Sequence, residues 1–96
     1  MKPSDALNAY RDELRQLALR HGVLQPRVFG SALTRTDTED SDLDLLVDPG
    51  AETSLFTLAA LQNEAEALMG VTVSVLTPLS LPVEFRNQVL NEASPI

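Results

Sequence analysis

The sequence predicts an α/β domain with a small mixed sheet of three or four strands and helices mainly on one face. Apolar residues recur at three- or four-residue steps in three segments, as amphipathic helices require. Short apolar runs bounded by Gly, Pro and Asp lie between these segments and predict strands. One pair of strands is joined without a helix and the next pair through one, which predicts antiparallel and parallel pairing respectively.

The first helix is expected to run from Ser4, which suits an N-cap, to about Arg20. Its apolar face would consist of Leu7, Tyr10, Leu14, Leu17 and Ala18. His21 is expected to contact the C-terminal end of this helix, and Gly22 to stop it. The short β-prone run Arg27–Phe29 then predicts the first strand.

A polar loop is expected over residues 30–41, because Gly, Ser, Thr, Asp and Glu dominate this segment. Its acidic side chains are expected to be solvated, namely Asp37, Glu39 and Asp40. The second strand would cover residues 43–47 and end at the turn over residues 48–50. This strand is unusual because Asp42 and Asp44 interrupt its apolar pattern.

The second half of the chain is expected to form a helix, a strand and a closing helix. Ser54 would cap the helix, which ends at Gly70, and the alternation over residues 71–75 predicts the third strand. The closing helix would span about residues 82–93 with an apolar face of Val83, Phe85, Val89 and Leu90. We expect this face to complete the core, with docking of a partner protein as the alternative.

Composition describes one acidic domain over residues 1–96, with a net charge of −7 and no cysteine. Disulfides and thiolate metal sites are excluded because both need cysteine sulfur. The negative field repels polyphosphate, so direct DNA binding is not expected. The amino-terminal stretch lacks a continuous apolar segment, which predicts a cytoplasmic protein without a membrane span. The thin core of a short chain favours a homo-oligomer or a partner subunit.

The first candidate site is the pair Asp42 and Asp44. Residues i and i+2 of a strand leave the same face, so the two carboxylates point the same way. Two anions beside buried leucines are unfavourable unless a cation or hydrogen-bond donors compensate. Carboxylate oxygens suit Mg²⁺ or Mn²⁺. The alternative is that Asp42 caps the loop and Asp44 lies at an exposed strand edge.

The second candidate is the dipeptide formed by Gly30 and Ser31, directly after the first strand. Glycine permits close approach of the backbone, and serine adds a hydroxyl and an amide donor. If the next residues begin a helical turn, their free N–H groups would accept a phosphate. Alone, the dipeptide is also compatible with an ordinary turn. Together with Asp42 and Asp44 it predicts a phosphate cradle facing a metal-binding pair.

The string Val28-Phe29-Gly30-Ser31, followed after ten residues by Asp42-Leu43-Asp44, resembles the G-S-x10-D-x-D signature of the minimal nucleotidyltransferases, relatives of the DNA polymerase beta superfamily. The resemblance covers nearly the whole chain and implies the nucleotidyltransferase fold. It implies that Gly30 and Ser31 hold the terminal phosphates of a nucleoside triphosphate, and that Asp42 and Asp44 are catalytic ligands of Mg²⁺ or Mn²⁺.

The resemblance also implies a partner and a reaction. Domains of this kind, the MntA-like antitoxins, commonly pair with a helical HEPN toxin, and several transfer AMP from ATP to a tyrosine of that partner. The same antitoxin activity, with ATP as substrate, is therefore expected here. A transferase acting on a small molecule or on nucleic acid is less well supported, because the chain scarcely exceeds a catalytic core.

One position departs from the superfamily, which usually supplies a third carboxylate from the next strand. This chain has Val73-Ser74-Val75 there, and a neutral hydroxyl is a much weaker ligand for a hard cation. Three interpretations stay open. The domain is a slow transferase, or a catalytically impaired nucleotide-binding antitoxin that neutralises its partner by binding, or an enzyme in which Asp40, Asp48 or Glu84 compensates.

Two further expectations concern residues outside these motifs. Arg35 follows the Gly-Ser dipeptide, and an exposed loop arginine is the simpler interpretation than a phosphate ligand. The three phenylalanines, Phe29, Phe56 and Phe85, each lie in an apolar pattern. They are expected in the core rather than as stacking platforms for a base.

Overall fold

The computed structural model describes residues 1–96 and contains a four-stranded sheet in the order β3-β2-β1-β4. Strand β1 (Leu24–Phe29) pairs antiparallel with β2 (Leu43–Asp48) and with β4 (Ser94–Pro95). Strand β2 pairs parallel with β3 (Val73–Leu76). The sheet is therefore mixed, and the pairing directions predicted from the sequence are confirmed.

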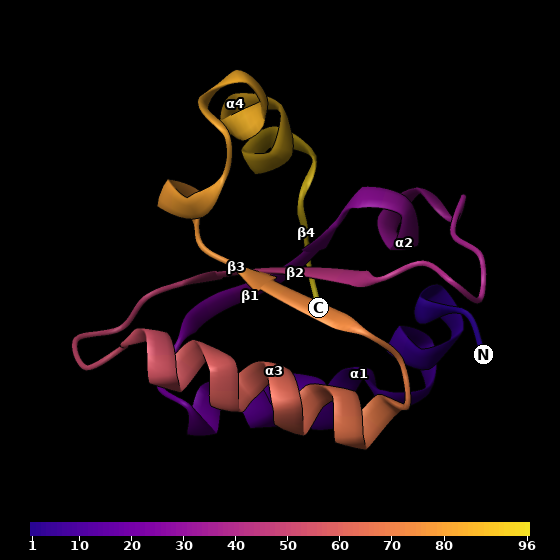
Figure 1. Ribbon diagram of the computed structural model, residues 1–96, viewed down its shortest axis with the longest axis horizontal. Coiled ribbons are helices and arrows are strands. Elements are labelled where there is room, and N and C mark those ends of the chain that lie inside the picture. Colours follow the sequence, from indigo (N-terminus) through magenta and orange to yellow (C-terminus); the bar gives the residue numbers. More distant parts are fainter.

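The two long helices, α1 (Pro3–Arg20) and α3 (Leu55–Met69), lie together on one face of the sheet (Figure 1). The closing helix α4 (Val83–Glu92) stands over the opposite face. Two short helices complete the structure, α2 (Gly30–Thr34) and η1 (Pro78–Ser80). No helix combines the length and apolar character needed to cross a bilayer.

The core lies between α1, α3 and the sheet, and β2 shows how it is built. Leu43, Leu45 and Val47 alternate along this strand, face the two long helices and expose no surface. The core contains 16 buried residues, most of them from these three elements. The alternate residues of β2 consequently point to the face that α4 overlooks.

The sequence predicted that Ser4 caps the amino-terminal end of α1. In the structure a distant loop residue, Asp37, binds this end of the helix. The N-cap is Lys2, and Ser4 lies inside the helix. The backbone N–H of Ser4 donates to Oδ2 of Asp37 at 2.7 Å, and its hydroxyl donates to Oδ1 at 2.9 Å. Asp37 is only 6% exposed, so the prediction that it is solvated is wrong. Its carboxylate satisfies a free helix N–H and ties the loop to α1.

Several elements were missed or misplaced at the sequence level. β1 begins at Leu24 and not at Arg27, because a bulge between these residues lets the strand continue past Pro26. The short elements α2, η1 and β4 carry too few residues for a periodic signal. His21 follows α1 as predicted, and its Nε2 contacts the Glu64 carboxylate of α3.

The closing helix does not complete the core. No residue of α4 is buried, and Val83 and Phe85 are 74% and 57% exposed. Helix α4 is instead held by Arg86, whose Nε donates to the carbonyl oxygen of Pro78 at 2.8 Å. Leu81 is buried just before the helix. The amphipathic pattern of the segment therefore predicted a helix correctly but its packing wrongly.

None of the three phenylalanines belongs to the core. Phe56 is the second residue of α3 and is 87% exposed, while Phe29 is half-buried. The next residue inward from Phe29, Val28, faces the core, so alternation turns Phe29 to the other side of the sheet.

The contact between Asp37 and Ser4 predicts a pH dependence. The backbone N–H of Ser4 is the largest cause that lowers the pKa of Asp37 below its ordinary value of 3.8. A lowered pKa in the folded state stabilises the fold above the unfolded pKa, and this contribution is lost as pH falls through the folded pKa. Asp37→Asn should therefore lower the melting temperature at pH 7, and the difference from wild type should disappear at strongly acidic pH.

Thermal melts followed by circular dichroism would measure this effect. Asp40→Asn is the matched control, because Asp40 is an exposed acid of the same loop. An equal decrease in melting temperature for both variants would contradict a specific role of Asp37.

Candidate functional site

Asp44 is the second residue of β2 and points to the face away from the core. Asp44 is half-buried between two fully buried leucines, Leu43 and Leu45, whereas Asp42 is exposed and directly precedes the strand. The strand places Asp44 because its neighbours need burial on the opposite side. An aspartate is thus held in a partly desolvated position that it would not occupy by its own preference.

Burial raises the pKa of the Asp44 carboxyl above its ordinary value of 3.8, and the negative charge of Asp42 raises it further. The two carboxylates are therefore close enough to repel one another. A divalent cation would relieve this repulsion, and carboxylate oxygens are the ligands that Mg²⁺ or Mn²⁺ accepts. The donor set fits such an ion if water or phosphate oxygens supply its remaining ligands, which is usual for Mg²⁺.

Gly30 lies against the Asp44 carboxylate. The register of β1 and β2 pairs Phe29 with Asp44, so the chain leaves β1 beside this aspartate. At position 30 φ is +72°, and a Cβ there would overlap Oδ2 of Asp44. Only glycine meets both conditions, because it tolerates positive φ and carries no side chain. The structure thus brings together the two motifs that stand ten residues apart in the sequence.

Ser31 occupies the second position of α2, directly after this contact. The helix begins at Gly30, and no side chain caps it. The first N–H groups of a helix have no partner within the helix, and no side chain caps those of α2. Phosphate binding was expected from the sequence only if a helical turn follows Ser31, and α2 provides this turn.

Ser74 is the residue of β3 that pairs with Asp44 in the parallel ladder. Register partners on neighbouring strands point to the same face, so Ser74 stands beside the aspartate pair. It is half-buried and neutral. The position where the superfamily carries its third carboxylate is therefore adjacent to the site, but here it contributes a hydroxyl.

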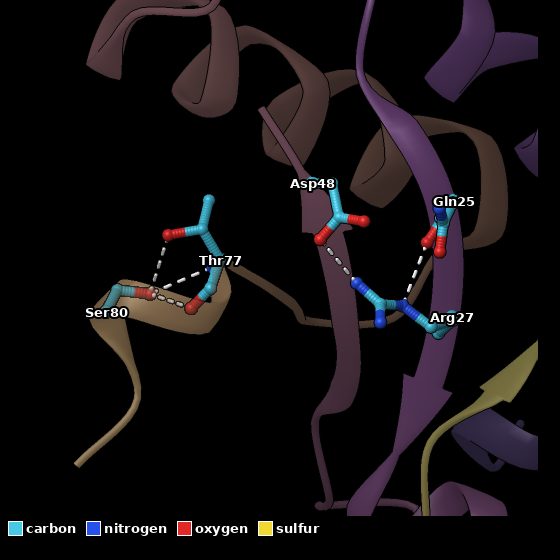
Figure 2. Close-up of polar contacts among 5 residues, drawn as sticks. All are labelled: Gln25, Arg27, Asp48, Thr77 and Ser80. Carbon is cyan, nitrogen blue, oxygen red and sulfur yellow. Dashed lines mark hydrogen bonds and ion pairs between the residues drawn. The ribbon is translucent and has the colours of Figure 1, made fainter. Parts of the chain in front are cut away.

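The structure groups no third acid with Asp42 and Asp44. Asp48 is bound to Arg27, whose Nη2 lies 2.7 Å from Oδ1 and whose Nε donates to the carbonyl oxygen of Gln25 at 3.0 Å (Figure 2). Asp40 and Glu84 are exposed. No group of three or more His, Cys, Asp or Glu residues is placed to hold a metal ion. The geometry gives no support to compensation by another acid.

Phe29 is the site residue that the sequence analysis missed. It pairs with Asp44 across the antiparallel ladder and so shares its face. The alternation of buried and outward residues along β1 was the signal that could have found it. The site consequently has an apolar wall beside the carboxylates. The aspartates line none of the four cavities of the structure, so the site is an open surface.

The chain is similar to a known protein family and to named relatives. A family model described as a nucleotidyltransferase domain matches residues 7–96. A Methanocaldococcus jannaschii protein assigned as a protein adenylyltransferase is 36% identical over 91% of this chain and 94% of its own length. The protein adenylyltransferase MntA of Thermococcus cleftensis is 38% identical over 90% of this chain and 84% of its own length.

Solved structures agree with these matches. A chain assigned as a minimal nucleotidyltransferase superposes with a TM-score of 0.87 at 40% identity, covering 97% of this chain and 95% of that one. A chain from a crystal structure of a toxin–antitoxin with AMP-PNP gives a TM-score of 0.73 at 17% identity, covering 88% and 69%. The second match shows the shared fold alone. The nucleotidyltransferase fold expected from the sequence is confirmed.

The close approach of Gly30 to Asp44 predicts that substitutions at the two positions are coupled. Gly30→Ala should destabilise the fold by more than about 1–2 kcal/mol, since positive φ alone costs a residue with a Cβ about that much. Asp44→Ala removes the overlapping oxygen and leaves a Cβ at 3.6 Å, so in that background only the φ cost remains. A double-mutant cycle from urea denaturation should therefore show coupling between the two changes.

Gly70→Ala is the matched control, because Gly70 has φ +70° and nothing within 4 Å of the added Cβ. It should cost less than Gly30→Ala and should not couple to Asp44→Ala. Equal costs at the two glycines would contradict the packing of Gly30 against the carboxylate.

Proposed function

The chain belongs to the nucleotidyltransferase domain family, and from that premise we propose that it is an antitoxin that transfers AMP from ATP to a toxin partner. The observation that carries the proposal is the contact of Gly30 with Asp44. This contact joins a set of phosphate-binding donors to a pair of carboxylates that requires a cation. A phosphate cradle and a cation site on one surface are what a bound nucleoside triphosphate needs.

Each residue of the site has a role in this proposal. Gly30 lets the triphosphate approach the backbone, and Ser31 donates its amide and hydroxyl hydrogens to the terminal phosphate oxygens. Asp42 and Asp44 hold Mg²⁺ or Mn²⁺. When bound, the divalent cation supplies charge neutralisation and lowers the pKa of the attacking hydroxyl.

The transfer follows from the in-line chemistry of phosphoryl groups. The hydroxyl oxygen of the acceptor forms a bond to the α-phosphorus, the bond to the β-phosphate oxygen breaks, and pyrophosphate leaves. The hydroxyl proton passes to solvent. The side chains of this protein orient and stabilise the charges and form no covalent intermediate.

The nature of the donor and acceptor rests on the relatives. Two of them are named as protein adenylyltransferases, and a toxin–antitoxin of the same fold was crystallised with an ATP analogue. These names support ATP as the donor and a protein as the acceptor. The acceptor that we propose is a tyrosine of a HEPN toxin, as the resemblance to the minimal nucleotidyltransferases implies.

Ser74 favours a second candidate function. A site with two carboxylates and a neutral neighbour binds a nucleotide-associated cation better than it activates an acceptor hydroxyl. In this alternative the chain is a catalytically impaired, nucleotide-binding antitoxin subunit. It neutralises its partner by forming a complex.

Labelled ATP, Mg²⁺ and a HEPN partner protein provide the test. The proposal expects labelled AMP on the partner and expects Asp42→Ala with Asp44→Ala to reduce labelling by more than about 100-fold, because even outer-shell partners of metal ligands cost 10–100-fold when mutated. Asp40→Ala, which removes an exposed acid of the same loop, should leave labelling unchanged. A complex that forms without labelling, and that survives the double substitution, would instead support the impaired antitoxin.

Position 74 offers a gain-of-function test. Ser74→Asp restores a carboxylate beside Asp44 and should raise turnover by about tenfold or more if a metal ligand is missing there. Without Mg²⁺ the same change should lower stability, because a third anion joins a carboxyl whose pKa is already raised. Turnover with and without Mg²⁺ and thermal melts would measure both effects.

Asn87→Asp is the control for this experiment, because it adds the same charge on an exposed face of α4. Unchanged turnover for Ser74→Asp in a protein that is already fast would show that position 74 is not the missing ligand.

A further inference from the structure

A second polar site lies away from the aspartates, in a cleft between α1, α2 and β4. The cleft has a volume of about 160 Å³. Its lining includes Asn8, Arg11, Val28, Ala32, Arg35 and Ser94. Two arginines thus meet at one small cleft of a protein whose net charge is −7.

Neither arginine is neutralised. Arg15, Arg27 and Arg86 all bind a carboxylate or backbone carbonyl oxygens. Arg11 and Arg35 make no ion pair and no side-chain hydrogen bond, and the same holds for Arg20, which lies outside this cleft.

The surroundings explain why these two cations stay unpaired. The helical neighbours of Arg11 at three- and four-residue steps are Leu7, Asn8, Leu14 and Arg15, none of which is acidic. The acid nearest to Arg35 in sequence is Asp37, and both of its carboxylate oxygens accept hydrogen bonds from Ser4. Ser4 also lines the cleft, so the Asp37 carboxylate lies next to it, but no ion pair joins this carboxylate to either arginine.

The backbone at Arg35 shows how this residue comes to line the cleft. Its φ is +60°, in the left-handed region that residues with a Cβ seldom adopt. A left-handed residue is a common way for a helix to end, so the C-cap of α2 explains this conformation. In this conformation Arg35 ends α2 and lines the cleft opposite Arg11 of α1.

We propose that this cleft binds a phosphate group, as the free ion or as a phosphate monoester. The planar guanidinium matches phosphate oxygens in a two-pronged hydrogen bond, and Asn8 and Ser94 offer further donors. The volume is below the roughly 300–1,000 Å³ of sites that enclose a whole small molecule. It therefore suits one phosphate group whose remaining substituents, where present, lie outside.

The cleft is distinct from the nucleotide site. Val28 in its lining pairs with Leu45, and both belong to the core on the α1 side of the sheet. Phe29 and Asp44 pair on the opposite side. The inference therefore stands independently of the proposed transferase activity.

Calorimetric titration with inorganic phosphate at low ionic strength tests the inference, since screening weakens exposed charge interactions. Arg11→Gln and Arg35→Gln should each weaken phosphate binding by about tenfold or more, because a hydrogen bond to a charged group is lost. Arg20→Gln is the matched control, since it removes the same charge from the same helix outside the cleft. Arg11→Lys should restore part of the affinity, and thermal melts of each variant would verify folding.

Two further experiments show which site binds the phosphate and which kind of phosphate compound is bound. Ser31→Ala reports on the nucleotide site and should not change phosphate binding at the cleft. Phosphoserine, with serine as its control, tests a monoester: binding of both phosphate and phosphoserine indicates a group on a larger molecule, and binding of inorganic phosphate alone indicates the free ion. The inference is overturned by the lack of saturable binding at millimolar phosphate, by equal weakening in Arg20→Gln, or by binding that depends on Ser31 and not on the arginines.

Discussion

The half-buried carboxylate of Asp44 is the constraint around which the rest of the site is arranged. Burial beside Leu43 and Leu45 and repulsion from Asp42 disfavour its ionised form. Gly30 must lack a side chain because this carboxylate occupies the space. Ser74 stands next to it on the other flank. The row Phe29, Asp44, Ser74 across three strands therefore contains the apolar wall, the anion and the substituted ligand position of one surface.

Sequence reasoning succeeded where a local pattern determines the structure. The alternation of apolar and polar residues identified β2 and turned Asp44 away from the core, whereas Asp42 precedes the strand and its shared face with Asp44 stays a prediction. Sequence reasoning failed where a contact joins residues that are distant in the chain. The capping of Ser4 by Asp37 spans 33 positions, and no local pattern announces it. The exposure of α4 was missed for a different reason, because an apolar helical face looks the same whether it packs inward or stays uncovered.

The replacement of a carboxylate by Ser74 has two opposing physical consequences. A third anion beside Asp42 and Asp44 would strengthen cation binding but would add to a repulsion that already raises the pKa of Asp44. Because the hydroxyl is neutral, it does not add to this repulsion when no metal is bound. It also removes a hard ligand from the place where an acceptor hydroxyl would be activated. Stability without metal and catalytic power with metal therefore change in opposite directions at this one position.

The two faces of β2 have different roles, because one packs in the core and the other carries the Asp44 carboxylate. Leu43, Leu45 and Val47 are fully buried and supply the core, while the aspartates that alternate with them contribute nothing to it. Removing the two carboxylates therefore leaves the packed side intact and takes away an unfavourable charge pair. A loss of nucleotide chemistry in such variants reports on the site itself, because the fold loses no apolar burial. The same separation holds for the arginine cleft, whose guanidinium groups lie outside the core that its floor residue Val28 helps to form.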